Sequence, residues 1–448
     1  MAGLAIDGLS SGLDTTALIN SLIAVEGNQQ VLLKQKQATG SSLVTALQAL
    51  NTRVASLAEA AKTATKDTSW GAVKGTSSAE SVVVTAASGA VPSTLSFTVD
   101  RVATSQSSLL AIPADLDPAD PTLTISLGGK DTAVTALTND PRDIAAAINS
   151  SDAGVKAAVI NVGTADTPSY RLQLTGTETG AASSFTVSYA SAGGPATASL
   201  SQVRAAGDAQ ITLFPGTDAA QSMTSATNAF NGLLGDVTIT VSKVEAEAVT
   251  VDVVRDTEAL TNLAKNLVSN IGVVLSEISS RTKASTGTTS DGAATLKPGL
   301  FGGDTTIRFL QQDILSQASA PIDGVSPADV GIVIARDGTF TFDQEKFSAA
   351  LAEDPAKVQK IVAGVAANVQ AVADRASDKV DGSLTSRIKS TEATVSEMGD
   401  RISDWDDRLA RRRETLVRIY SALEVSMSKM QSTSNWLSSQ IAQLNATK

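Results

Sequence analysis

The sequence predicts a multidomain α+β protein in which N- and C-terminal helices form a coiled-coil leg, with two β-rich head domains, one inserted in the other. Apolar residues recur at heptad spacing near both chain ends. Between them Val alternates with Ser and Thr, a pattern typical of half-buried strands. The 448 residues exceed the size of one hydrophobic core, which indicates about two to four domains.

A heptad seam begins at Leu18 and ends at Ala61. Its members are Leu18, Leu22, Val25, Gln29, Leu32, Lys36, Thr39, Leu43, Leu47, Leu50, Val54, Leu57 and Ala61. The polar members at positions 29, 36 and 39 weaken its first half. Residues 1–42 are therefore predicted to be a flexible segment that orders with a partner, and residues 43–70 to be the firm part of the leg.

A second, longer seam runs from Leu384 to Leu444. A helix of about 60 residues is roughly 90 Å long, and it needs its apolar stripe buried. We expect part of the stripe to pack against the N-terminal helix and the rest to face neighbouring subunits. The leg is thus predicted over residues 43–70 and 257–448, with about 20 terminal residues that are flexible or order on assembly.

The middle of the chain is predicted to form the two head domains. One comprises residues 71–115 and 207–256, and the inserted one comprises residues 116–206. Strands are expected over 81–85, 94–102, 122–127, 170–175, 185–189, 207–214 and 237–254. Pro141–Ser150 should be a short helix with Asp140 as its N-cap.

Helix is expected to return after residue 256. Segments 257–282 and 305–319 should be helices, and Asp354-Pro355 should begin another. Asp337-Gly338 indicates a hairpin turn. Residues 283–292 (KASTGTTSDG) are expected to form a loop.

The composition excludes several classes of function. The chain has no Cys and no His, so disulfides, thiolate nucleophiles and the usual zinc ligand sets are excluded. A net charge of -11 disfavours nucleic acid as a partner. The start (MAGLAIDGLSSGLD) lacks the features of a cleaved signal peptide, and no apolar run approaches the ~18 residues of a membrane span. We expect no cofactor, no metal and no membrane insertion.

Two groups of residues resemble sites of chemistry. Gly299–Asp304 precedes a helix, a placement that can hold phosphate, but it lacks the Lys-Ser/Thr continuation, which favours a tight turn with a helix cap. Asp404, Asp406 and Asp407 are flanked by Arg, which favours a solvated face over a general acid. We therefore predict no catalytic residue and no enzyme.

Several ordered motifs resemble the flagellar hook-associated protein 2 family, the filament cap. At the N-terminus they are Gly8–Asp14 (GLSSGLD) and 22–26 (LIAVE). Toward the C-terminus they are 299–308 (GLFGGDTTIR), 381–384 (DGSL) and 420–431 (YSALEVSMSKMQ). The match covers about half of the chain; one departure is Ile271-Gly272, near which the family tends to place Tyr-Asn.

The resemblance implies a non-enzymatic cap at the distal end of the bacterial flagellar filament, which supports motility. Such a protein is exported unfolded by the flagellar type III apparatus without a cleaved signal peptide. It forms a ring of about five or six subunits, single or paired, and promotes flagellin folding and insertion. Its implied partners are further copies of itself, flagellin, hook-filament junction proteins and a cytoplasmic export chaperone.

The apolar residues of the two seams are the predicted assembly or partner contacts. We expect residues before Leu43 and after Ser426 to contact flagellin or junction proteins. The full predicted set is Leu13, Asp14, Leu18, Leu22, Leu43, Leu47, Leu50, Val54, Leu57, Ile402, Trp405, Leu409, Leu416, Ile419, Leu423, Met430, Trp436, Leu437 and Leu444.

Two other functions fit parts of the sequence. A secreted surface adhesin or another coiled-coil structural protein would share the helical ends, and it would bind through its β-rich domains. A glycan hydrolase would need paired carboxylates in a concave site. The candidates for such a pair are Asp131, Asp152, Asp166 and Glu178.

Overall fold

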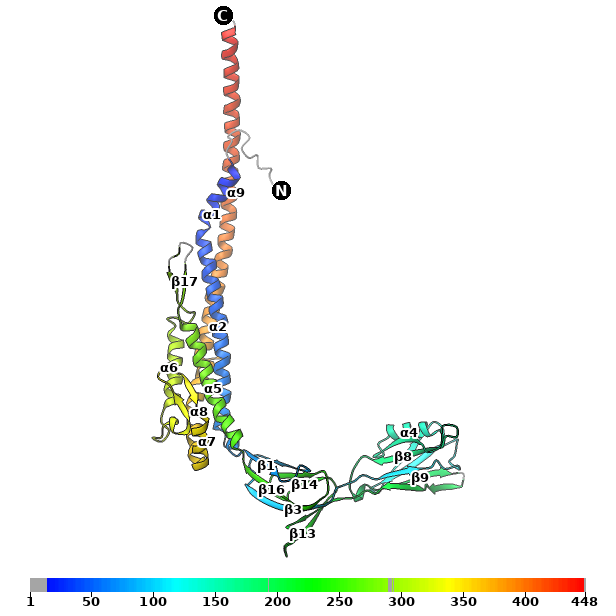
Figure 1. Ribbon diagram of the computed structural model, residues 1–448. Coiled ribbons are helices and arrows are strands. Elements are labelled where there is room, and N and C mark those ends of the chain that lie inside the picture. The colour runs from blue at the N-terminus through cyan, green and yellow to red at the C-terminus, as the bar shows by residue number, and fades with distance from the viewer. Residues whose placement is uncertain (1–13, 192, 289–291, 293, 447–448) are drawn as a thin grey trace. The chain divides into compact units, whose positions relative to one another are not determined.

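The computed structural model describes residues 14–191, 193–288, 292 and 294–446, and the chain divides into two compact units (Figure 1). The helical unit comprises Met1–Lys66 and Thr261–Lys448, and the β unit comprises Asp67–Leu260. This mixture of separate helical and sheet elements confirms the predicted multidomain α+β class.

Long helices dominate the helical unit. They are α1 (Thr15–Glu26), α2 (Asn28–Thr65), α5 (Thr257–Thr282), α6 (Thr305–Ser319), α7 (Gln344–Glu353), α8 (Pro355–Ser377) and α9 (Ser383–Ala446). Two small antiparallel hairpins accompany them: β17 (Ser285–Thr288) with β18 (Ala294–Lys297), and β19 (Ile332–Ile334) with β20 (Phe340–Phe342). The first hairpin corrects the loop expected over 283–292, because alternating small and β-branched residues there support strand pairing.

The core of the helical unit forms where α2 packs against α8 and α9. Four apolar residues of α2 that were predicted as partner contacts are fully buried in this core, so they stabilise the unit itself. They are Leu47, Leu50, Val54 and Leu57. Val362, Val365, Ala366 and Val369 of α8 are also fully buried.

The first half of the N-terminal seam lies one residue away from its predicted register. Leu33 is buried and Leu32 is exposed, although the heptad places Leu32 on the packed face. The buried position before it is Gln30 rather than Gln29. The physical reason is polar: the Gln30 amide bonds to α9, and a periodicity of apolar residues does not detect such a contact.

The flexible segment expected over 1–42 lies partly outside the described residues, and its described part is helical from Thr15.

The β unit contains two modules. The first β module has a five-stranded sheet of order β1-β16-β3-β12-β13 and a three-stranded sheet of order β14-β15-β2. Its strands are β1 (Val73–Ser77), β2 (Val82–Ala86), β3 (Ser93–Arg101), β12 (Ala209–Leu213), β13 (Gln221–Ser225), β14 (Ala229–Asn231), β15 (Val237–Val241) and β16 (Glu245–Arg255). Phe97, Val99, Ile211 and Val251 are fully buried in its core.

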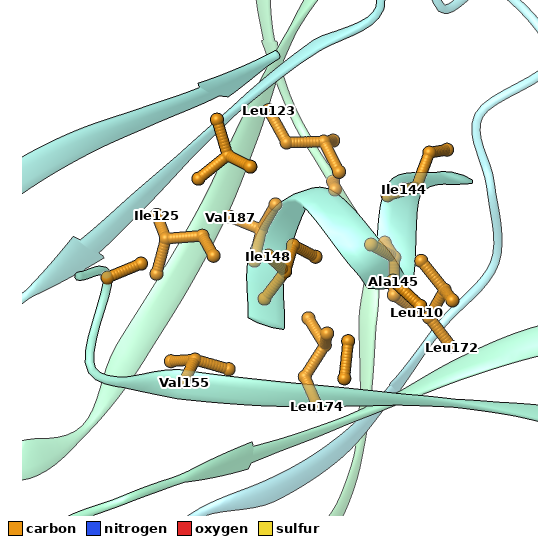
Figure 2. Close-up of a cluster of buried hydrophobic side chains, with 14 of the residues drawn as sticks. Leu110, Leu123, Ile125, Ile144, Ala145, Ile148, Val155, Leu172, Leu174 and Val187 are labelled. Carbon is orange, nitrogen blue, oxygen red and sulfur yellow. The ribbon is translucent and has the colours of Figure 1, made fainter. Parts of the chain in front are cut away.

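The inserted β module lies in sequence between β3 and β12. Two four-stranded sheets, β10-β9-β5-β6 and β11-β4-β8-β7, pack around the helix α4 (Pro141–Ser150). The strands are β4 (Ser107–Leu110), β5 (Thr122–Leu127), β6 (Lys130–Thr135), β7 (Val155–Asn161), β8 (Tyr170–Gly176), β9 (Phe185–Ser191), β10 (Gly194–Thr197) and β11 (Leu200–Arg204). Figure 2 shows Ile144 and Ile148 of α4 among Leu123, Ile125 and Val187.

Local signals predicted several elements to the residue. The helix 141–150 has Asp140 as its N-cap, which accepts from Arg142 N at 2.8 Å. Helices 257–282 and 305–319 have the predicted bounds. Strand β4, which falls before the predicted domain boundary at 115/116, pairs with β8 and β11 of the inserted module.

Candidate assembly surface

The two chain ends meet along α1 and α9. Arg412 Nε donates to Glu26 Oε1 at 2.9 Å, and Arg413 Nη2 donates to Asn20 Oδ1 at 2.6 Å. Asp14, the N-cap of α1, accepts from Ala17 N at 2.8 Å. These contacts join residues that are almost the whole chain length apart in sequence, so α1 covers one face of α9 within the helical unit.

Polar contacts also join the start of α2 to the middle of α9. Gln30 Nε2 donates to the carbonyl of Ile402 at 3.2 Å and to Asp406 Oδ1 at 2.5 Å. Lys34 Nζ lies 3.9 Å from the same carboxylate. Asp406 is thus occupied by neutral and cationic partners, which supports the solvated-face interpretation of the acidic cluster.

The apolar stripe of α9 continues beyond this cover. Leu416, Leu423, Met430 and Leu437 follow one another at seven-residue spacing and therefore share one helix face. Leu416 is 7% exposed, whereas Leu423, Met430 and Leu437 are 44%, 68% and 53% exposed. Figure 1 shows α9 continuing past the start of α1. We call Ile419, Leu423, Met430, Leu437 and Ile441 the distal stripe.

The predicted contact residues therefore fall into distinct classes. Ile402 and Leu416 are buried against the rest of the helical unit, while Leu43, Trp405 and Leu409 are half-buried. The Arg408 guanidinium lies 4.7 Å from the Trp405 ring centre. The exposed members are Leu18, Leu22, Ile419, Leu423, Met430, Trp436 and Leu437. Leu13 and the side chain of Leu444 lie outside the described residues.

Several exposed apolar residues were missing from the predicted set. Val25 and Leu32 belong to the N-terminal seam, and Ile441 follows Leu437 by one helical turn. Helical spacing alone identifies Ile441 as part of the stripe. Val425 is also exposed, and no heptad signal marks it.

The glycine-rich segment before α6 is a turn with a helix cap. Asp304 Oδ1 accepts from Thr306 N at 3.0 Å and from Ile307 N at 3.3 Å. The first-turn amides that a phosphate would use therefore already have an anionic partner. A Cβ at Gly299 would meet the carbonyl oxygen of Arg281 at 2.2 Å, which explains glycine there.

No group suited to catalysis emerges in the described part of the chain. Asp131, Asp152, Asp166 and Glu178 are all exposed, so none has the desolvated setting of a general acid. A cleft of about 380 Å³ between α5, α6 and the β19–β20 turn contains Asp337, whose pKa is lowered by hydrogen bonds from Thr339. An acid with a lowered pKa is a poor proton donor at neutral pH.

The described residues form neither a metal site nor a membrane-spanning helix. They contain no cluster of three acidic side chains placed to hold a metal ion. None of the described helices combines the length and apolar character of a membrane-spanning segment. The apolar surface that the described residues of α1 and α9 expose is therefore the candidate functional site.

Comparison with known families covers most of the chain. Residues 206–432 match the family described as flagellar hook-associated protein 2 C-terminus, and residues 11–106 match the corresponding N-terminus. Residues 122–178, within the inserted β module, match the flagellin hook IN motif.

Individual relatives agree with these matches. Flagellar hook-associated protein 2 of Escherichia coli strain K12 is 25% identical, over 98% of each chain. The B-type protein of Pseudomonas aeruginosa PAO1 is 27% identical, over 96% of each chain. The crystal structure of the D1-D2-D3 domains of the flagellar cap protein FliD from Escherichia coli aligns with a TM-score of 0.60 at 22% identity, covering 78% of this chain and 99% of that chain.

Proposed function

Because the chain belongs to the flagellar hook-associated protein 2 family, a family of structural proteins and not of enzymes, we propose that it caps the distal end of the bacterial flagellar filament. In this role it assembles as a ring-like homo-oligomer and promotes the folding and insertion of flagellin during elongation. It reaches the filament tip by type III export, without a cleaved signal peptide.

The distal stripe is the observation that carries this proposal. Exposed apolar side chains at seven-residue spacing along one helix are suited to pack against another helix. Helices in proteins gain most of their stability from packing, so the exposed apolar side chains of α9 from Leu423 onward are suited to a partner outside the described residues. Helices of neighbouring subunits or of flagellin supply the required surface.

The start of the chain offers a second contact surface. Leu18, Leu22 and Val25 of α1 are exposed and lie at helical spacing. We assign this surface to flagellin or to hook-filament junction proteins at the filament tip. Before export, a cytoplasmic chaperone that shields exposed apolar helices would prevent premature assembly through the same two surfaces.

Charge substitutions on the distal stripe test the proposal. Met430→Glu with Leu437→Glu places two carboxylates on the stripe. The matched control, Ser432→Glu with Ser439→Glu, adds the same charge to exposed positions on the opposite face of the helix. Light scattering with mass detection should give a defined oligomer for the wild type and the control, and a smaller particle for the stripe variant.

The stripe variant and the control should also differ in their ability to support filament growth in cells. The control should support filament growth in a strain that lacks its own cap, and the stripe variant should not. If the wild type stays monomeric at all concentrations, or if both variants behave alike, the distal stripe is not an assembly surface. A β unit that alone binds a host surface would then favour the adhesin alternative.

A further inference from the structure

Most sheet edges in the β unit carry a feature that blocks pairing with another chain. Charged side chains mark three of them, Lys74 on β1, Lys130 on β6 and Lys156 on β7. Strand β10 contains Pro195, and β11 has a bulge between Gln202 and Arg204.

The remaining edges, apart from β13, are short or covered. Strand β14 has three residues. Strand β1 lies against β2 so closely that a Cβ at Gly75 would meet Val84 Cγ1 at 2.3 Å. Strand β7 is additionally covered by Asn149 of α4, whose side-chain amide donates to Ala157 O at 2.8 Å and accepts from Ala157 N at 2.9 Å.

Strand β13 has none of these features. It forms one margin of the five-stranded sheet (Figure 1), and it pairs with β12 in unbroken register, without a bulge. It contains no Pro, and the surrounding segment 219–235 contains no charged residue. In a chain of net charge -11, copies repel one another, and an uncharged edge is a place where a second copy can approach at low electrostatic cost.

The backbone groups of β13 that point outward can be assigned. Phe214 N donates to Ser96 O at 3.0 Å, so Phe214 bonds toward β3. Hydrogen-bonding direction alternates along a strand, which turns Leu213 and Ile211 toward β13. Their partners in register are Gln221 and Met223. The N–H and C=O groups of Ser222 and Thr224 therefore face away from the sheet.

We propose that β13 pairs with β13 of a second copy, antiparallel and centred on Met223. In this register Ser222 of each copy forms a hydrogen-bonded pair with Thr224 of the other. The two Met223 side chains meet in a non-hydrogen-bonded pair, where side chains are closest. Within one copy Met223 lies opposite the buried Ile211, which lies opposite Val99. A second copy would extend this apolar row and cover Met223, which is 37% exposed.

Disulfide trapping tests the pairing in full-length protein, because the chain has no cysteine of its own. Met223→Cys should give a covalent dimer on oxidation, since directly opposite Cα atoms lie about 4.5 Å apart in such a pair. Ser222→Cys alone should not give a covalent dimer, because Ser222 of one copy lies opposite Thr224 of the other and only diagonally to its Ser222. A mixture of Ser222→Cys and Thr224→Cys chains should form mixed dimers.

Leu137→Cys, at a 90% exposed position in the inserted module, measures random collision. Dimer formation by Met223→Cys above that background supports the proposal. Its absence, or equal trapping at positions 222, 223 and 137, overturns it.

A proline substitution tests the backbone contribution. Thr224→Pro removes an outward N–H and leaves the bonds to β12 intact. In the Met223→Cys background it should weaken dimer formation roughly 10- to 30-fold, because each copy loses one intermolecular hydrogen bond. Thr224→Val retains the N–H and should trap as well as Thr224. If Thr224→Pro traps equally well, β13 pairing is not the contact. This result would leave the distal stripe of α9, and its own test, unaffected.

Discussion

Arg387 of α9 donates its Nε–H to Oδ2 of Asp304 at 2.9 Å, while Oδ1 of the same carboxylate caps α6. The Asp304 side chain is only 8% exposed, and that of Arg387 is 40% exposed. One carboxylate thus caps the start of α6 and forms an ion pair with α9. The glycine-rich turn before Asp304 positions this side chain for both contacts.

Replacing Asp304 should destabilise the helical unit in two separable steps. Asp304→Asn retains a cap acceptor and loses the charged partner of Arg387, so we expect a loss of about 1–2 kcal/mol in the free energy of unfolding. Asp304→Ala also loses the cap and should cost about 1 kcal/mol more. Urea unfolding followed by circular dichroism measures both. Asp343→Asn, at the N-cap of α7, is the control, because Asp343 caps its helix without a described ion pair; equal losses at both sites would contradict the prediction.

The helices α2 and α9 approach each other so closely at Gly40 that a larger residue does not fit there without a shift. A Cβ there would meet Val395 Cγ2 at 2.7 Å. Gly40→Ala should therefore lower stability by about 1–2 kcal/mol, although alanine favours helix by about 1 kcal/mol over glycine. Val395→Ala should relieve the clash, so the double variant should be more stable than the sum of the single changes indicates.

The double-mutant cycle with urea unfolding measures this coupling. Ser41→Ala, at an exposed neighbouring position of α2, controls for helix propensity. Additive effects of Gly40→Ala and Val395→Ala would show that the two positions do not interact, which contradicts a close contact of α2 and α9 at Gly40.

The turn between α8 and α9 should make a pH-dependent contribution. Asp378 Oδ1 accepts from the amides of Asp381 and Val380, each at 2.8 Å, and these bonds lower the pKa of Asp378 in the folded chain. The folded pKa is below the unfolded value, so the stabilisation is complete above the unfolded pKa and is lost as pH falls through the folded one. NMR titration of the carboxyl carbon should give a midpoint below the ordinary Asp value. Asp378→Asn should lose this part of the acid dependence, and a midpoint at or above the ordinary value would refute the assignment.

Local signals explain which elements were predictable. Asp140, Asp304 and Asp354 cap helices whose apolar spacing is also regular, so the starts of these helices follow from neighbouring residues. The seam before Leu43 was displaced by one residue because Gln30 is buried through its bonds to α9, a partner distant in sequence. Strand β4 was missed because its four residues carry little periodicity.

The candidate surface was predictable only in part. Heptad spacing identified the distal stripe through Leu437, because the same face continues along one helix. It did not distinguish Leu50, which is fully buried against the rest of the chain, from Met430, which is exposed. That distinction depends on where α1 and α2 end relative to α9, which requires the tertiary arrangement.

The division of the chain into two units favours an order of folding. All residues of the β unit come from one continuous segment, 67–260, whereas α2 meets α8 and α9 only across the whole of that segment. Closing so long a loop carries a large entropic cost, and contacts of high sequence separation form slowly. The β unit can therefore fold while the helical ends are still unpaired, and its folding shortens the effective loop that α2 and α9 must close. The Glu26–Arg412 contact joins residues 386 apart in sequence, so we expect it to be among the last contacts to form.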